Sequence, residues 1–227
     1  MTWTSAKGAY SQPVAEHALA LSLALLRVLQ RRAREYRWST VREGTSLAGL
    51  DVVVIGAGGI GGEIVRLLTA FGASITVVRR KPVDVAGAKL TVGTDRLAEV
   101  LPRADLVIIA AALTDVTSGL LGLAEFAVLK PGVNIVNIAR GALIDTDALL
   151  SALRSGHVAG AALDVTDPEP LPEGHPLWNE PGVLITPHSA DTPEMIAPLL
   201  AARVKTNVYA FSTGGDLVGV VNAAEGY

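Results

Sequence analysis

Short apolar runs alternate along the chain with longer segments in which apolar residues recur at helical spacing. The apolar runs predict strands that are covered on both faces, at residues 52–56, 75–78, 106–110, 134–138, 160–165 and 183–186. The longer segments predict helices at residues 60–71, 94–101, 121–129 and 145–155. Because strands and helices that alternate in this way form a doubly wound parallel sheet, we expect an α/β fold.

A long amphipathic helix is predicted ahead of the first strand, at residues 13–37. Its apolar positions step by four or three residues, as they do along one face of a helix; they are Val14, Ala18, Leu21, Leu25 and Val28. A second apolar stripe beside them makes this face wide. Two interpretations stay open, because the face can pack on the chain's own domain or against a second subunit.

Composition narrows the class of protein. Of the 227 residues, 50% are hydrophobic and 23 are glycine, which supplies a large core and suits a sheet crossed by tight turns. The formal net charge of −3 gives no basic field for nucleic acid or for an anionic membrane. The sequence has no cysteine, which excludes disulfides and thiolate metal sites. No pair of its histidines has metal-ligand spacing, so no metal site is expected.

The most hydrophobic segment lacks the pattern of a membrane span. Residues 14–29 contain Glu16, His17 and Arg27, whereas a spanning helix needs about 20 nearly uninterrupted apolar residues. The polar start of the chain has neither the basic region nor the cleavage site of a secretory signal. We therefore expect a soluble, cytoplasmic protein.

A glycine-rich turn follows the first predicted strand and leads into a helix. It reads Gly-Ala-Gly-Gly-Ile-Gly at residues 56–61, in the strand–turn–helix context that a dinucleotide site requires. Gly56 allows the tight turn, Gly58 lets the backbone approach a pyrophosphate, and Gly61 lets helix and strand pack closely. The helix N-terminus attracts the anion. We therefore expect the sheet to be Rossmann-like.

The second predicted strand ends at Val78, where an NAD-binding protein carries an acidic residue for the ribose 2′-hydroxyl. This chain has Arg79 in that place, followed by Arg80. A guanidinium can pair with a 2′-phosphate through two hydrogen bonds, so the sequence favours NADP as cofactor, with NAD still possible. The alternative is that Arg79, Arg80 and Lys81 form a solvated basic loop.

Polar side chains follow the last three apolar runs. Arg140, Glu169 and His188 each lie just beyond one of them. Because ligands of an open α/β sheet bind outside the carboxyl ends of its strands, these residues would face one cleft with the glycine turn. Taken singly, each also has a structural interpretation, as a helix-flanking charge, a loop carboxylate and a capping or buried histidine.

Together, these segments resemble the D-isomer-specific 2-hydroxyacid dehydrogenase family over nearly the whole chain. The resemblance rests on the glycine turn and on residues 14–17, 137–141, 163–172, 175–177 and 187–188. Thr166 and residues 168–170 are most similar to glyoxylate/hydroxypyruvate reductases. The resemblance implies an oxidoreductase that transfers a hydride between a nicotinamide cofactor, with NADPH favoured, and a small 2-oxo or 2-hydroxy acid.

The resemblance also implies a role for each site residue. His188 would be the general acid/base, Glu169 its partner, and Arg140 the group that holds the substrate's carboxylate and carbonyl. Physical chemistry agrees, because a carboxylate favours the charged imidazole beside it and a guanidinium fork matches a 2-oxo acid. Asp164 would bind the nicotinamide carboxamide. The other positions implied against the cofactor are Gly59, Ile60, Ala112, Thr117, Ile138 and Ala139, together with Arg140 and His188.

Members of the family begin with an N-terminal substrate lobe that is absent from this sequence, so the resemblance predicts the cofactor domain of such an enzyme. We expect residues 1–45 to be an arm with a helix that forms a homodimer, residues 46–192 a dinucleotide-binding domain, and residues 193–227 a helix and tail that pack back. The alternative function is a non-catalytic dinucleotide-binding or redox-sensing dimerisation module.

Ala112 replaces the family's usual proline, and Ser189 follows the histidine where a glycine-bearing turn is usual, so we expect altered selectivity.

Overall fold

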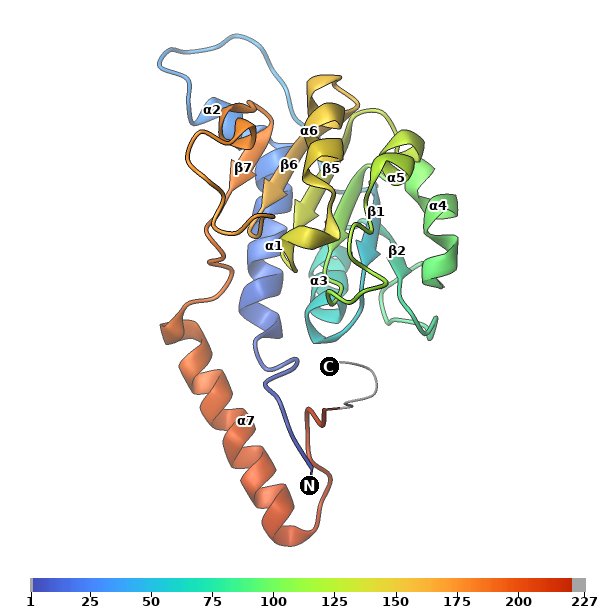
Figure 1. Ribbon diagram of the computed structural model, residues 1–227, viewed down its shortest axis with the longest axis vertical. Coiled ribbons are helices and arrows are strands. Elements are labelled where there is room, and N and C mark those ends of the chain that lie inside the picture. The colour runs from blue at the N-terminus through green and yellow to red at the C-terminus, as the bar shows by residue number, and fades with distance from the viewer. Residues whose placement is uncertain (1, 222–227) are drawn as a thin grey trace.

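A computed structural model describes residues 2–221 and contains a seven-stranded parallel sheet (Figure 1). Its strand order is β3-β2-β1-β4-β5-β6-β7, so the chain starts in the middle of the sheet and winds outward in both directions. The strands are β1 (Asp51–Ile55), β2 (Ser74–Val78), β3 (Leu90–Val92), β4 (Leu106–Ile109), β5 (Val133–Asn137), β6 (Val158–Leu163) and β7 (Val183–Ile185). This order confirms the predicted doubly wound, Rossmann-like fold.

The core lies on both faces of the sheet. Successive strand residues point to opposite faces, so that Val53 belongs to one buried apolar cluster and Val54 to the other. Helices cover both clusters: α1 (Ser11–Leu26) and α3 (Gly59–Ala70) on one face, and α4 (Leu97–Val100), α5 (Leu123–Val128) and α6 (Thr146–Arg154) on the other.

The apolar face of α1 is buried within the chain's own domain. The helix packs beside α3 and over β5 and β6. Its buried apolar residues are Val14, Ala15, Ala18, Leu21, Leu25 and Leu26. Of the two interpretations that the sequence left open for this face, packing on the chain's own domain is the one found.

The helix predicted at residues 13–37 is shorter than expected. α1 ends at Leu26, a single turn named α2 (Leu29–Arg32) follows, and Val28 between them has a left-handed φ of 57°. The carbonyl oxygen of Leu26 accepts a hydrogen bond of 2.7 Å from the N–H of Thr45. The returning chain thus takes the acceptor that a continuing helix would need, so the prediction of one helix to residue 37 is wrong.

Two further elements differ from the sequence prediction. β3 was not predicted, because it has three residues at the edge of the sheet and only its last residue is buried. The segment predicted as one helix at residues 94–101 is instead α4 between two 3₁₀ turns, η1 (Thr94–Arg96) and η2 (Leu101–Arg103). Pro102 in the second turn has no N–H to extend an α-helix.

The C-terminal helix α7 (Pro193–Thr213) points away from the sheet (Figure 1), and none of its residues is buried. Arg203 Nη1 donates hydrogen bonds to the carbonyl oxygens of Ser5, at 3.2 Å, and Lys7, at 3.0 Å. The predicted helix is present, but it contacts the N-terminal segment and does not pack back on the sheet. Other helices already cover both faces of the sheet. Residues 222–227 of the predicted tail lie outside the described residues.

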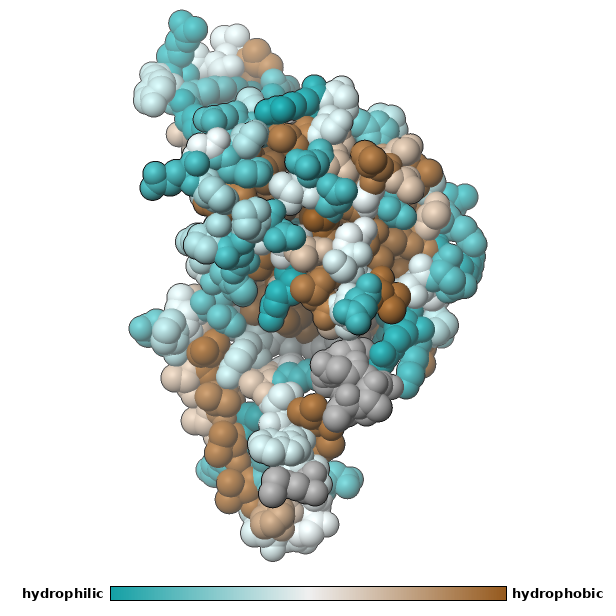
Figure 2. All heavy atoms as spheres, in the orientation of Figure 1, coloured by the Kyte–Doolittle hydropathy of each residue, from teal (hydrophilic) through white to brown (hydrophobic). Residues whose placement is uncertain are grey.

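Apolar side chains form an exposed stripe along α7 (Figure 2). The stripe consists of Leu200, Val204, Val208 and Phe211, which are 40%, 53%, 64% and 80% exposed. Even so, within residues 2–221 no helix combines the length and apolar character needed to cross a membrane.

Candidate cofactor and active site

The expected site residues follow neighbouring strands at one edge of the sheet. Arg79 follows β2, the glycine turn follows β1, Arg140 follows β5, Glu169 follows β6 and His188 follows β7. Because all strands are parallel and lie in the order β2-β1-β4-β5-β6-β7, their carboxyl ends form a row. Adjacent strands are about 4.8 Å apart, so the row from the glycine turn to His188 is roughly 20 Å long.

Two glycines of the turn allow backbone segments to come into close contact, and a third, Gly58, leaves the N-terminus of α3 accessible. Gly56 has a φ of +94°, and a Cβ there would lie 2.6 Å from the carbonyl oxygen of Ala110. A Cβ at Gly61 would collide with the carbonyl oxygen of Gly56. Gly58 is the N-cap of α3, and nothing lies within 4 Å of the position of its missing Cβ. The turn therefore fits a dinucleotide, whose pyrophosphate needs access to a helix N-terminus.

Gly59 faces the N-terminal segment. A Cβ at Gly59 would lie 2.7 Å from the Cα atom of Gly8 and would also collide with Ser11 Oγ. The first turns of α1 and α3 thus pack against each other at this glycine. Packing between two helices is therefore a sufficient reason for glycine here, beside the cofactor contact that the resemblance implied. The neighbouring Ile60 is half-buried against the core.

Arg79 lies next to the glycine turn. The N–H of Gly56 donates a 2.7 Å hydrogen bond to the carbonyl oxygen of Val78, the residue before Arg79. The backbone N–H of Arg79 binds the carbonyl oxygen of Val92 at 3.0 Å. Arg79 is half-buried and Arg80 is exposed. Both arginines therefore stand where the sequence placed them, and contact with a 2′-phosphate stays a prediction.

The loop after β4 is closed by a threonine hydroxyl. Thr117 Oγ1 donates to the carbonyl oxygen of Ala112 and accepts from the N–H of Thr114, each at 2.8 Å. These bonds bring Ala112 and Thr117 together. Ala112 is exposed, and the hydrogen bonds of Thr117 close this loop without the proline that the family usually has there.

Asn137, at the end of β5, shapes the loop that presents Arg140. Its Nδ2 donates to the carbonyl oxygen of Arg140 at 2.9 Å, and its Oδ1 accepts from the N–H of Ala139 at 3.0 Å. Asn137 is buried and Arg140 is exposed, with Nη1 donating to the carbonyl oxygen of Ala139 at 2.6 Å. Ile138 and Ala139 are also buried, so they lie mainly in the core beneath the loop.

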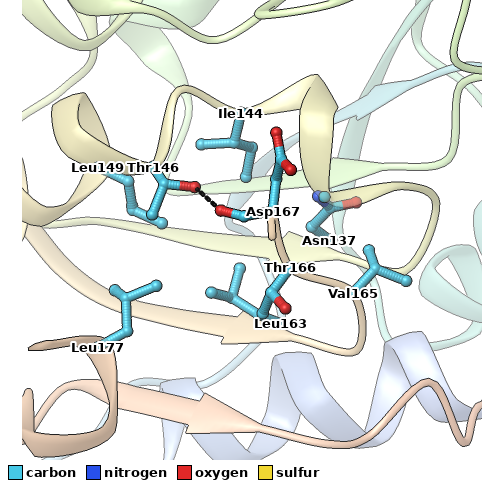
Figure 3. Close-up of a pocket in the computed structure, with 10 residues that line it drawn as sticks. Asn137, Ile144, Thr146, Leu149, Leu163, Val165, Thr166, Asp167 and Leu177 are labelled. Carbon is cyan, nitrogen blue, oxygen red and sulfur yellow. Dashed lines mark hydrogen bonds between the residues drawn. The ribbon is translucent and has the colours of Figure 1, made fainter. Parts of the chain in front are cut away.

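The loops after β5 and β6 touch at a glycine. A Cβ at Gly141 would collide with the carbonyl group of Thr166. In the same loop, the carbonyl oxygen of Asp167 accepts a 2.9 Å hydrogen bond from Thr146 Oγ1 (Figure 3). The cavity drawn there has a volume of about 10 Å³, hardly enough for one water molecule. It therefore belongs to the packing beneath the site and cannot hold a cofactor.

Glu169 and His188 form a short polar contact at the candidate active site. His188 Nδ1 lies 2.6 Å from Glu169 Oε1, and both side chains are nearly half exposed. The two side chains are therefore in contact, and the acid/base role that the resemblance implies for them stays a prediction. Because Glu169 accepts from Nδ1 when that nitrogen carries a proton, Nε2 is the nitrogen left for a ligand.

Asp164 organises the backbone around His188. Its carbonyl oxygen accepts from the N–H of His188 at 2.8 Å. Its carboxylate accepts from the N–H of Ser189 at 2.9 Å and from the N–H of Ala190 at 3.1 Å. His188 has a positive φ of 51°, which costs a residue with a side chain about 1–2 kcal/mol. One buried residue thus holds three successive N–H groups of a strained turn.

The Asp164 carboxylate also belongs to a side-chain network that the sequence did not reveal. Thr186 Oγ1 donates to Asp164 Oδ1 at 2.6 Å, and His17 Nε2 lies 3.0 Å from Thr186 Oγ1 and 3.3 Å from Asp164 Oδ1. Burial alone would raise the pKa of Asp164, but the hydrogen bonds from His17, Thr186 and the N–H of Ser189 outweigh it and lower this pKa from 3.8 to about 2. The carboxylate therefore stays ionised, and its contact with a nicotinamide carboxamide stays a prediction.

Comparison with known protein families assigns the chain to one of them. The family described as D-isomer specific 2-hydroxyacid dehydrogenase, NAD binding domain, matches residues 18–190. The chain belongs to this family, and the resemblance noted in the sequence is confirmed.

Individual relatives agree with this assignment. D-3-phosphoglycerate dehydrogenase of Bacillus subtilis is 36% identical over 92% of this chain and 40% of that protein. Glyoxylate/hydroxypyruvate reductase A of Serratia proteamaculans is 38% identical over 77% of this chain and 55% of that protein. The chain therefore spans about half the length of these two relatives. Their names are those of oxidoreductases.

A solved structure shows the same fold. A D-isomer specific 2-hydroxyacid dehydrogenase from Xanthobacter autotrophicus, in complex with NADPH and MES, is 33% identical with a TM-score of 0.86, and the match covers 100% of this chain and 94% of that one. The chain is thus an NAD(P)-binding domain of this family.

Proposed function

We propose that the chain is the cofactor-binding part of an enzyme that interconverts a small 2-oxo acid and its 2-hydroxy acid, with NADPH as the preferred cofactor. The observation that carries the proposal is the 2.6 Å contact between His188 Nδ1 and Glu169 Oε1, at the sheet edge that also carries the glycine turn. A bound nicotinamide would supply or accept the hydride.

His188 moves the proton in this proposal. In the reductive direction, His188 Nε2 donates a proton to the carbonyl oxygen of the substrate, and in the oxidative direction it takes the proton back. Glu169 orients the imidazole ring by accepting from Nδ1 and leaves Nε2 for the substrate. Asp164 fixes the turn that carries the ring, through the hydrogen bonds to His188, Ser189 and Ala190.

Arg140 binds the substrate. Its guanidinium presents N–H groups in a planar fork that matches a carboxylate and a neighbouring carbonyl oxygen. Asn137 and the Gly141 contact with Thr166 hold its loop against the loop that leads to Glu169. The substrate would therefore be oriented between Arg140 and His188 before the proton moves.

The remaining site residues hold the cofactor. The α3 N-terminus at Gly58 binds the pyrophosphate, and Arg79 and Arg80 pair with the 2′-phosphate of NADPH. The other residues that we propose for this site are Gly56, Gly59, Ile60, Gly61, Ala112, Thr117, Ile138, Ala139 and Asp164.

A homodimer completes the proposal, with a contact surface that differs from the buried face of α1. Tyr36 and Trp38, in the segment after α2, are fully or almost fully exposed, at 103% and 94%. Exposed aromatic side chains of this kind are typical of an interface. We expect sedimentation to give a dimer at micromolar concentration. The double variant Tyr36→Ser, Trp38→Ser should be a monomer under the same conditions.

The enzymatic part is tested by turnover of glyoxylate and hydroxypyruvate with NADPH. His188→Gln should lower kcat by about 10²- to 10⁴-fold, the usual contribution of a general acid, with a much smaller effect on NADPH affinity. His157→Gln is the matched control, because His157 binds the carbonyl oxygen of Leu129 before β6, at the opposite edge of the sheet. Equal turnover by both variants would refute the role of His188. Turnover by the wild type would exclude the alternative, a non-catalytic dinucleotide-binding module.

A further inference from the structure

His17 lies behind the candidate active site, on a helix that precedes the first strand. Its Nε2 is 3.0 Å from Thr186 Oγ1 and 3.3 Å from Asp164 Oδ1, although Thr186 follows His17 by 169 residues. The imidazole ring is mostly buried, with 21% of its side chain exposed. This contact ties α1 to the end of β7, directly before the turn that carries His188.

The hydrogen bonds fix the direction of donation. A threonine hydroxyl has one proton, and the 2.6 Å distance from Thr186 Oγ1 to Asp164 Oδ1 assigns that proton to the carboxylate. Thr186 Oγ1 is therefore the acceptor toward His17, and His17 Nε2 must carry a proton. His17 thus donates toward a buried carboxylate, through Thr186 and directly.

The carboxylate in turn sets the turn after β7. Asp164 holds the N–H groups of Ser189 and Ala190 with its two carboxylate oxygens and that of His188 with its carbonyl oxygen. A buried carboxylate that loses a donor is destabilised, because its desolvation is no longer offset. Loss of the His17 donor would therefore loosen the same turn that places His188 against Glu169.

We propose that His17 is a positioning residue for the reaction: by donating from Nε2 to Thr186 and Asp164, it holds His188 in the conformation in which Nδ1 binds Glu169. This inference rests on the proposed function, in which the pair of His188 and Glu169 handles the proton. It assigns to α1 a part in the active site in addition to its place in the core.

The test uses nitrogen-15 NMR of the histidine rings in the whole chain. In the wild type we expect neutral His188 to be protonated on Nδ1 and neutral His17 on Nε2. His17→Leu should abolish the Nδ1-protonated signature of His188. His17→Gln should restore it, since an amide can donate from a similar position. His157→Gln should leave it unchanged, and the His157 resonance reports that each His17 variant is folded. A structural role alone would lower the melting temperature without moving the His188 signature.

Two further variants separate the possible failures. Glu169→Ala should abolish the same signature, and an unchanged His188 in that variant would overturn the proposed pair itself. A response to Glu169→Ala without a response to His17→Leu would overturn the role of His17 alone. Should His17→Leu fail to fold, Thr186→Val removes the hydroxyl between His17 and Asp164, with Thr186→Ser as the matched control. An unchanged His188 signature in Thr186→Val would then overturn the proposal.

Discussion

His188 is hydrogen-bonded through its N–H to the carbonyl oxygen of Asp164, at 2.8 Å. The end of β6 therefore holds the residue that we propose as the acid/base at the end of β7. The carboxylate of Asp164 binds the next two N–H groups, of Ser189 and Ala190. This arrangement offsets the left-handed conformation of His188 and keeps its ring beside Glu169.

The Asp164 carboxylate should make the stability of the protein depend on pH in acid. Its pKa falls from 3.8 to about 2 on folding, which corresponds to roughly 2 kcal/mol. Because the folded-state pKa is the lower one, this contribution is complete above about pH 4 and is lost as the pH falls through about 2. Asp164→Asn should thus lower the free energy of unfolding near pH 7 by at least this amount, with a smaller difference near pH 3. Urea unfolding at both pH values checks this, and a difference independent of pH would contradict it.

Two neighbouring glycines of α3 should respond in opposite directions to substitution by alanine. Gly59→Ala places a Cβ against Gly8 and Ser11, so we expect a loss of about 1–3 kcal/mol in the free energy of unfolding. Gly62→Ala is the matched control, because nothing lies within 4 Å of its missing Cβ, and it should stabilise the helix by roughly 0.5–1 kcal/mol. Thermal or urea unfolding measures both. A neutral Gly59→Ala would mean that α1 and α3 are not in contact there.

Arg79 should set the choice between the two dinucleotides. Removal of a charge-assisted hydrogen bond costs about 1.5–3 kcal/mol, so Arg79→Ala should weaken NADPH binding by roughly 10- to 100-fold and leave NADH binding nearly unchanged. Arg154→Ala is the control, since Arg154 pairs with Glu180 away from the row of strand ends. The preference for NADPH should also decline at high salt, which screens an exposed phosphate contact. Equal losses for both dinucleotides in Arg79→Ala would refute the assignment.

The sequence predicted those features that depend on local chemistry. The glycine turn could be identified because Gly56 and Gly61 must lack side chains for adjacent backbone segments to touch, and this requirement is visible in the motif. The row of site residues could be predicted because parallel strands end at one edge. The pairing of Glu169 with His188 followed from the family resemblance.

Long-range contacts account for what the sequence did not predict. α1 ends at Leu26, whose carbonyl oxygen accepts a hydrogen bond from the N–H of Thr45 in the returning chain. The link from His17 to Thr186 depends on how α1 lies over the sheet, and no local pattern in either segment encodes it. The direction of α7 is likewise a long-range property, because other helices already cover both faces of the sheet.

Calorimetric titration of the purified chain with NADPH and, separately, with NADH at matched ionic strength tests the central claim most directly. We expect binding of NADPH that is clearly tighter than binding of NADH, since the glycine turn serves both dinucleotides and Arg79 and Arg80 favour the 2′-phosphate. Tighter binding of NADH would contradict the role given to the two arginines. Binding of neither dinucleotide would contradict the cofactor site itself, and with it the roles proposed for Arg140 and His188.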